Sequence, residues 1–109
     1  MIKKTRSRVA LAQISPKLGN LSSNIELHCA WIDRAQAAGA ELIIFPELSL
    51  TGYILQDLVP DLAISLSQAS VLKPLLDRAQ NIACIFGFVE LSDNFNFYNS
   101  AAYASEGTI

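Results

Sequence analysis

The sequence has few of the residues that build metal centres, disulfide frameworks or membrane spans. Its 109 residues include two cysteines and one histidine. Cys29 and Cys84 are not spaced as metal-binding or redox pairs are, and this cysteine usage favours a reduced, cytoplasmic setting. No apolar run approaches the roughly 20 residues that span a bilayer, so we expect no membrane partner. The sequence also has no glycine-rich phosphate loop and no metal-ligand cluster, so we expect no metal and no cofactor.

An excess of positive charge is also missing. The formal net charge is -2, whereas a nucleic-acid surface needs clustered positive charge, so we expect no nucleic-acid partner. The basic residues that do cluster lie at the N-terminus, and we interpret them as a solvated arm in preference to a phosphate or membrane contact. The apolar run behind them, residues 9–14, is too short for a signal peptide. The cluster consists of Lys3, Lys4, Arg6 and Arg8.

What the sequence does contain indicates an α/β fold. Apolar residues make up 51% of the chain, which is typical of a globular protein, and the length suits one small domain. Short apolar runs rich in β-branched and aromatic residues predict four strands. These strands cover residues 8–14, 41–46, 82–90 and 97–105.

Two segments between these strands repeat apolar residues at helical intervals. Asn20 and Ser23 compete as the N-cap of the first helix, and Gly39 is a natural stop at its end. The second helix is predicted over residues 61–80, interrupted or restarted at Pro74. Its core-facing residues are predicted to be Leu72, Leu75, Leu76 and Ala79.

The order of elements is therefore β-α-β-α-β-β. The run of residues 42–45 is apolar throughout, which predicts a central strand covered on both faces. Two helices are too few to cover both faces of such a strand. Residues 106–108 are also typical of a turn that leads into a further element. We therefore expect residues 1–109 to be the N-terminal portion of a single, truncated domain.

Glu47 is the candidate catalytic residue. It directly follows an apolar run that ends at Pro46, so we expect it at the C-terminal end of a strand, with its carboxylate turned toward a cleft rather than into bulk water. Sheets of α/β proteins place their sites at that end, and a carboxylate there can act as a general base. From position alone, an exposed loop glutamate without a chemical role is the more frequent outcome.

A set of short motifs follows the predicted elements at residues 9–13, 19–20, 38–47, 50–53, 98–101 and 107. Together they resemble the nitrilase superfamily of carbon–nitrogen hydrolases. The resemblance runs from about residue 8 to the last residue, and the pairing of Phe-Pro-Glu with Thr-Gly-Tyr is its most specific part. Residues 51–53 and 56–58, together with 15–20, are also similar to the glutaminase domains of glutamine-dependent NAD synthetases.

The resemblance implies a four-layer α-β-β-α sandwich and a Glu-Lys-Cys triad. Glu47 matches the glutamate, which takes the thiol proton so that the thiolate can attack an amide or nitrile carbon. The lysine holds the oxyanion. The family places its lysine and cysteine in segments after this stretch, so we expect residues 1–109 alone to be inactive. No cofactor is implied, and the full-length protein is expected to be a homo-oligomer.

Other reactive or aromatic residues receive secondary roles. Tyr53, in the loop after Glu47, is predicted to bind substrate, with packing of that loop onto the sheet as an equal alternative. Cys29 and Cys84 are expected in the core, and His28 is expected to be a surface or half-buried structural residue. Asn99 is expected to satisfy backbone groups near the site.

The function that follows is hydrolysis of a non-peptide carbon–nitrogen bond in a small amide or nitrile. The first alternative is the ammonia-supplying glutaminase domain of an NAD synthetase, which differs in where the released ammonia goes. The second is a non-catalytic truncated fragment.

Overall fold

The protein forms one mixed α/β unit around a single sheet. The structure is a computed structural model that describes residues 5–109. Its sheet has the order β1-β2-β3-β4, in which β1, β2 and β3 are parallel and β4 is antiparallel to β3. The strands are β1 (Val9–Leu11), β2 (Leu42–Ile44), β3 (Ala83–Leu91) and β4 (Phe97–Ala104). All four predicted strands are confirmed, although the first two are shorter than expected.

Helix α1 (Leu21–Ala37) begins at Asn20, whose side chain accepts a hydrogen bond from the Ser23 backbone N–H at 3.0 Å. Asn20 is thus the cap, and Ser23 is not. The helix ends before Gly39, which takes a positive φ of 82°. Arg8 donates to the carbonyl of Ala38 at 2.8 Å, so this part of the expected solvated arm is bound to the helix end. Lys3 and Lys4 lie outside the described residues.

The helix predicted over residues 61–80 is wrong in its first half. The structure has a short 3-10 turn (Gln56–Leu58), one turn of α2 (Val59–Leu62) and then extended chain. Ile64 pairs with β3: its N–H donates to Val89 and its carbonyl accepts from Leu91, at 2.8 and 3.0 Å. Two further 3-10 turns follow, Leu66–Gln68 and Ser70–Leu72.

The second half of that prediction holds. Helix α3 (Lys73–Arg78) starts next to Pro74, and Leu72, Leu75 and Ala79 are fully buried as expected. Leu76 is partly buried against the same core. None of the helices that residues 5–109 form is both long and apolar enough to cross a membrane.

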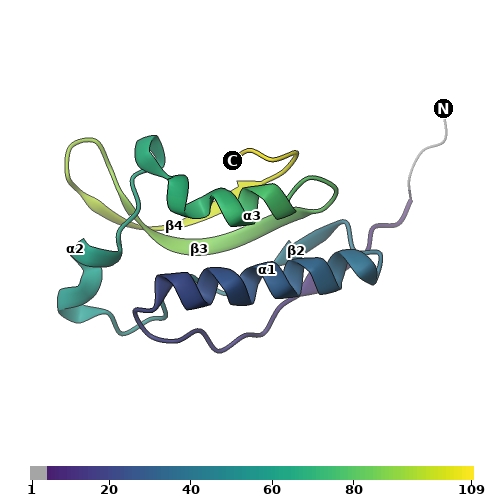
Figure 1. Cartoon of the computed structure of the whole chain (residues 1–109), viewed down its shortest axis with the longest axis horizontal. Coiled ribbons are helices and arrows are strands. Elements are labelled where there is room, and N and C mark those ends of the chain that lie inside the picture. Colours follow the sequence, from purple (N-terminus) through teal and green to yellow (C-terminus); the bar gives the residue numbers. More distant parts are fainter. Residues whose placement is uncertain (1–4) are drawn as a thin grey trace.

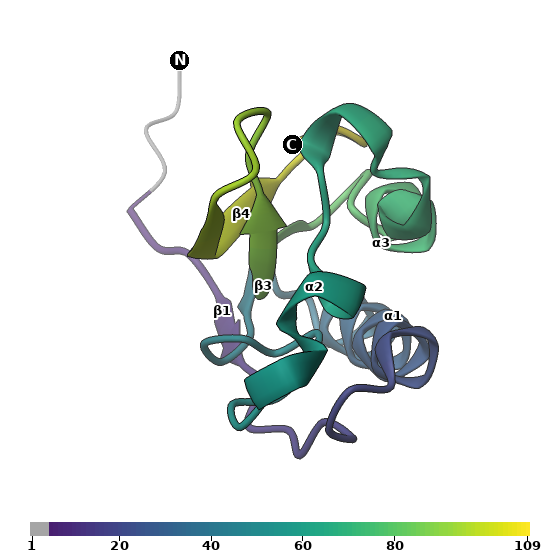
Figure 2. The ribbon, with the colours of Figure 1, turned by 90° about the vertical axis from the view of Figure 1, so that its left-hand side faces the viewer.

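The helices cover one face of the sheet. Figures 1 and 2 show α1 and α3 side by side on that face. The side chains beneath them form the core and include Ile43, Cys84, Phe86, Phe88, Ala102 and Ala104.

The opposite face, called here the uncovered face, carries the alternate residues of each strand. Leu11 and Tyr103 are 74% and 55% exposed there, and Leu42 and Ile44 are half-buried. The expected cover on both faces of β2 is therefore present on one face only. The described residues supply a helix layer and a sheet layer.

Candidate active site

The loop after β2 carries Glu47 onto the uncovered face. The Phe45 N–H still donates to the Ile85 carbonyl at 2.9 Å, and Pro46, which has no N–H, ends the pairing. Glu47 then lines a hollow of about 240 Å³ and remains exposed to solvent. The expected position after the strand is observed, with the side chain at a hollow that is open. The hollow is otherwise lined by Phe45, Pro46, Ile85, Phe86, Gly87, Asn99, Ser100 and Ala101.

Gly87 on β3 brings this loop close to the sheet. A Cβ at Gly87 would lie 2.3 Å from the backbone nitrogen of Leu48, a distance that real side chains do not reach. The Leu50 N–H donates to the Gly87 carbonyl at 3.0 Å, and the Gly87 N–H donates to Ser49 Oγ at 3.1 Å. Gly87 is a residue of the candidate site that was not predicted from the sequence. A glycine inside a strand is a signal of close backbone approach and could have identified it.

A buried polar network anchors the other side of the loop. His28 Nδ1 lies 2.6 Å from the Asn24 carbonyl, which can only accept, so Nδ1 carries the proton. His28 Nε2 then accepts from the Ser49 hydroxyl at 2.8 Å. Asn24 Nδ2 also donates to the Leu50 carbonyl at 2.8 Å. Two hydrogen bonds of this network, together with those to Gly87, therefore hold Ser49 and Leu50, just beyond Glu47.

His28 is fully buried, so its predicted surface or half-buried placement is wrong. Burial lowers the pKa of His28 to about 4, against the smaller opposing effect of its bond to the Asn24 backbone. The imidazole is therefore neutral near pH 7, as the network requires. Asn24 and His28 are four residues apart on the same side of α1 as Ile25 and Ile32, and that spacing was the available signal for burial.

Asn99 on β4 contacts Glu47 directly. Its Nδ2 donates to Glu47 Oε1 at 2.6 Å. The expectation that Asn99 satisfies backbone groups is therefore wrong, because its partner is the candidate catalytic carboxylate.

Tyr53 lies at a neighbouring hollow. It is 58% exposed and lines a cavity of about 250 Å³ together with Leu48, Gln56 and Asn99. Asn99 lines both hollows, so the cavity of Tyr53 adjoins that of Glu47. The structure thus places the two predicted site residues near one another, and a role of Tyr53 in substrate binding stays a prediction.

Neither cysteine can serve as a nucleophile at this site. Cys29 and Cys84 are buried in the core, as expected. Burial raises the pKa of Cys84 to about 11 and also raises the pKa of Cys29, so both thiols stay protonated near neutral pH. The residues that line the hollow of Glu47 include neither a cysteine nor a lysine.

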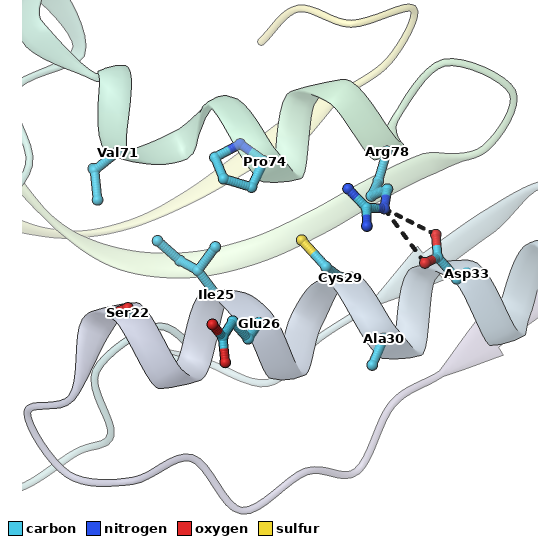
Figure 3. A pocket seen from close by; sticks show the side chains of 9 residues that line it. All are labelled: Ser22, Ile25, Glu26, Cys29, Ala30, Asp33, Val71, Pro74 and Arg78. Carbon is cyan, nitrogen blue, oxygen red and sulfur yellow. Dashed lines mark hydrogen bonds and ion pairs between the residues drawn. The ribbon is translucent and has the colours of Figure 1, made fainter.

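A larger groove of about 490 Å³ lies between α1 and α3, on the helix side of the sheet. Figure 3 shows Cys29 pointing from α1 toward α3, and Arg78 reaching Asp33 at one end of the groove. The Arg78 Nε to Asp33 Oδ1 distance is 3.1 Å, and both side chains are about half exposed. This groove is separated from Glu47 by the sheet. The carboxylates of Glu26 and Asp33 line it together with Cys29, whose pKa is raised, chiefly by burial.

Comparison with known proteins identifies relatives over almost the whole chain. Residues 8–108 match the carbon–nitrogen hydrolase family. The chain is 38% identical over 104 residues to the glutamine-dependent NAD(+) synthetase of Acinetobacter baylyi, covering 94% of this chain and 19% of that protein. The chain therefore spans about a fifth of the length of this relative.

Two experimental structures show the same fold. The glutamine-dependent NAD+ synthetase from Acinetobacter baumannii matches with a TM-score of 0.76 and 35% identity, over 93% of this chain and 19% of that one. An amidase from Nesterenkonia sp. matches with a TM-score of 0.79 and 23% identity, over 98% of this chain and 41% of that one. The resemblance to the nitrilase superfamily is confirmed: this chain belongs to the carbon–nitrogen hydrolase family.

Proposed function

We propose that this chain is part of a glutaminase in which Glu47 is the general base and the bond cleaved is the side-chain amide of glutamine. The observation that carries the proposal is the 38% identity, over 94% of the chain, to a glutamine-dependent NAD(+) synthetase. The position of Glu47 supports it, because an exposed carboxylate at a hollow on the uncovered face is accessible to groups outside residues 5–109.

Glu47 would take part in four proton transfers. Its carboxylate takes the proton of a cysteine thiol as the sulfur attacks the amide carbon. It then gives that proton to the leaving nitrogen, which departs as ammonia and leaves a thioester. Finally it takes a proton from water, whose oxygen attacks the thioester and releases glutamate, and the proton returns to the thiolate.

The other two groups must come from elsewhere in the protein. The family resemblance implies a cysteine as nucleophile and a lysine that holds the oxyanion. The lining of the Glu47 hollow contains neither. The proposal therefore assigns this chain the base and one wall of the site.

A second candidate is an amidase that releases ammonia to solvent. It is favoured by the match to the fold of the Nesterenkonia amidase, whose TM-score of 0.79 exceeds the 0.76 of the synthetase. We rank it second because the synthetase is more similar in sequence, at 35% against 23% identity.

The test is Glu47→Gln in the protein of full natural length. Gln has the same shape but cannot accept the proton, so we expect glutamine hydrolysis to fall at least about 100-fold. NAD synthesis from added ammonium should persist, because it bypasses amide cleavage. Glu26→Gln on the exposed side of α1 is the matched control and should leave both activities unchanged.

Retention of glutamine hydrolysis in Glu47→Gln would contradict the role of Glu47. The parent protein could instead hydrolyse simple amides but not glutamine, with no coupling to NAD synthesis. That result would favour the amidase over the glutaminase.

A further inference from the structure

The hydrogen bond between Asn99 and Glu47 joins two exposed side chains that are 52 residues apart in sequence. A carboxylate near neutral pH can only accept, so the amide must present its Nδ2 and not its Oδ1 to Glu47. The distance of 2.6 Å is at the short end for a bond to a charged acceptor. The contact therefore has a defined donor, acceptor and direction.

Backbone geometry brings the two residues together. In the β3–β4 ladder, Ala101 pairs with Gly87 and Asn99 pairs with Val89. Alternate residues of a strand share a face, so Asn99 lies on the uncovered face two residues from the point where the Glu47 loop rests on Gly87. The missing side chain of Gly87 is what allows the loop to come this close.

The bond leaves the two carboxylate oxygens with different surroundings. Asn99 engages Oε1, and within residues 5–109 no other hydrogen bond to the Glu47 carboxylate is formed. The donor is neutral, so it holds the carboxylate without placing a charge beside it. One oxygen is thus held and the other remains to exchange protons.

We propose that Asn99 is a positioning residue for the general base: its amide holds Glu47 through Oε1 so that Oε2 takes and returns the proton. This inference rests on the proposed function. A base held in one rotamer meets the reacting proton at the required distance, and a misplacement of about 1 Å can cost about 100-fold in rate.

The experiment measures glutamine hydrolysis by the protein of full natural length with Asn99→Ala, Asn99→Asp and Asn96→Ala. We expect Asn99→Ala to lower kcat about 10- to 100-fold while KM changes less than about threefold, because the base is misaligned and not the substrate. Asn99→Asp should be slower still, because it sets a second carboxylate against Glu47. Asn96→Ala is the matched control: this exposed asparagine precedes β4 and lines neither hollow, so kcat should stay within about twofold.

The relative kcat values of Asn99→Ala and Asn99→Asp show whether Asn99 positions Glu47 or only fills space. Asp has the shape of Asn, so if Asn99 only filled space, Asn99→Asp would be the faster variant. That order, or a kcat of Asn99→Ala within about twofold of the parent, would overturn the inference. The test compares the kcat values of the two variants with each other. It therefore stays valid if the melting temperature of either variant changes slightly.

Glu47→Gln in the same assay separates this inference from the proposed function. If Glu47→Gln is inactive and Asn99→Ala is not impaired, the positioning role alone is contradicted. If Glu47→Gln retains full activity, the proposed function fails, whatever the Asn99 variants do.

Discussion

At the scale of single residues, the candidate site depends on groups that carry no reactive chemistry themselves. Gly87 contributes only the space that its missing side chain leaves, and Ser49 contributes one hydroxyl between β3 and His28. Together they hold the segment directly after Glu47. The reactive carboxylate is therefore placed by its neighbours in the loop, whose positions are set by β3 and α1.

Gly87→Ala should disturb the Glu47 loop. The new Cβ would meet the Leu48 backbone nitrogen at 2.3 Å, and backbone atoms cannot move aside as a flexible side chain could. We expect a loss of stability of about 1–3 kcal/mol, as for other overpacked sites, together with slower glutamine hydrolysis. Thermal melts and initial rates of the full-length protein measure both. Ala30→Ser, at an exposed residue of α1 away from the Glu47 hollow, is the control, and an unchanged rate in Gly87→Ala would contradict the expectation.

His28 should make stability depend on pH. Its pKa is lowered by burial from 6.5 to about 4, so between these values the unfolded chain binds a proton that the folded chain does not. Stability is therefore fully present above about pH 6.5 and falls as the pH drops toward 4. Between pH 7 and pH 5 we expect a loss of about 2 kcal/mol from this group.

Denaturant melts at the two pH values test this expectation. His28→Gln should lower stability at pH 7, because it breaks the bonds to Asn24 and Ser49, but it should also flatten the pH dependence. A variant whose stability falls with pH as steeply as that of the parent would show that His28 is not the titrating group.

At the scale of elements, the helices differ in what stabilises them. Helix α1 has a cap, a stop and a buried stripe within its own sequence, and it forms as predicted. The segment from residue 61 has a helical pattern too. However, β2 pairs with β3 only as far as Ile85, and Ile64 pairs with β3 further along the same edge, at Glu90. Two backbone hydrogen bonds at that edge replace the helical ones, so tertiary pairing overrides the local pattern there.

The cap of α1 gives a prediction at this scale. Asn20→Ala should cost about 1 kcal/mol, because the Ser23 N–H loses its acceptor. Ser23→Ala should cost less, since its hydroxyl is not the cap, although its sequence position made it a candidate. Hydrogen exchange of the first turn of α1 compares the two variants. A larger effect of Ser23→Ala would contradict the observed cap.

At the scale of the whole molecule, the uncovered face is the dominant feature. Figure 2 shows α1 and α3 on one side of the sheet. On the other side Val9, Leu11 and Tyr103 are 46%, 74% and 55% exposed. Burial of apolar surface contributes about 25 cal/mol per Å², so a few hundred Å² left exposed lose several kcal/mol of stabilisation. The total stability of a domain is only about 5–15 kcal/mol.

We therefore expect the isolated 109-residue chain to associate through this face. Sedimentation and light scattering should show oligomers or aggregates, and Leu11→Lys with Tyr103→Lys should raise the monomer fraction. Val71→Lys, at an exposed residue of the groove on the helix side, is the control and should not. A monodisperse parent chain with a cooperative melt above about 60 °C would contradict the expectation.

The isolated chain is also expected to hydrolyse neither amides nor nitriles. Glu47 has no thiol to deprotonate within residues 5–109, because Cys29 and Cys84 are buried with raised pKa values. Ammonia release from glutamine and from a simple nitrile is the measurement. Turnover that disappears in Glu47→Gln would mean that a nucleophile in this chain was overlooked, and Cys29→Ser and Cys84→Ser would then identify it.

The sequence by itself determined the features that rest on local patterns. Apolar runs and turn residues were sufficient to place four strands, α1 and the loop with Glu47, because each depends on neighbours a few residues away. The family could be predicted for the same reason, since its motifs are short and contiguous.

Only the tertiary structure decided which distant residues meet. The burial of His28 against Ser49, the contact of Gly87 with Leu48 and the bond from Asn99 to Glu47 each join segments 21 to 52 residues apart. The pairing of Ile64 with β3 is of the same kind. Such contacts depend on strand order and register, which fix distances between elements that no local pattern encodes.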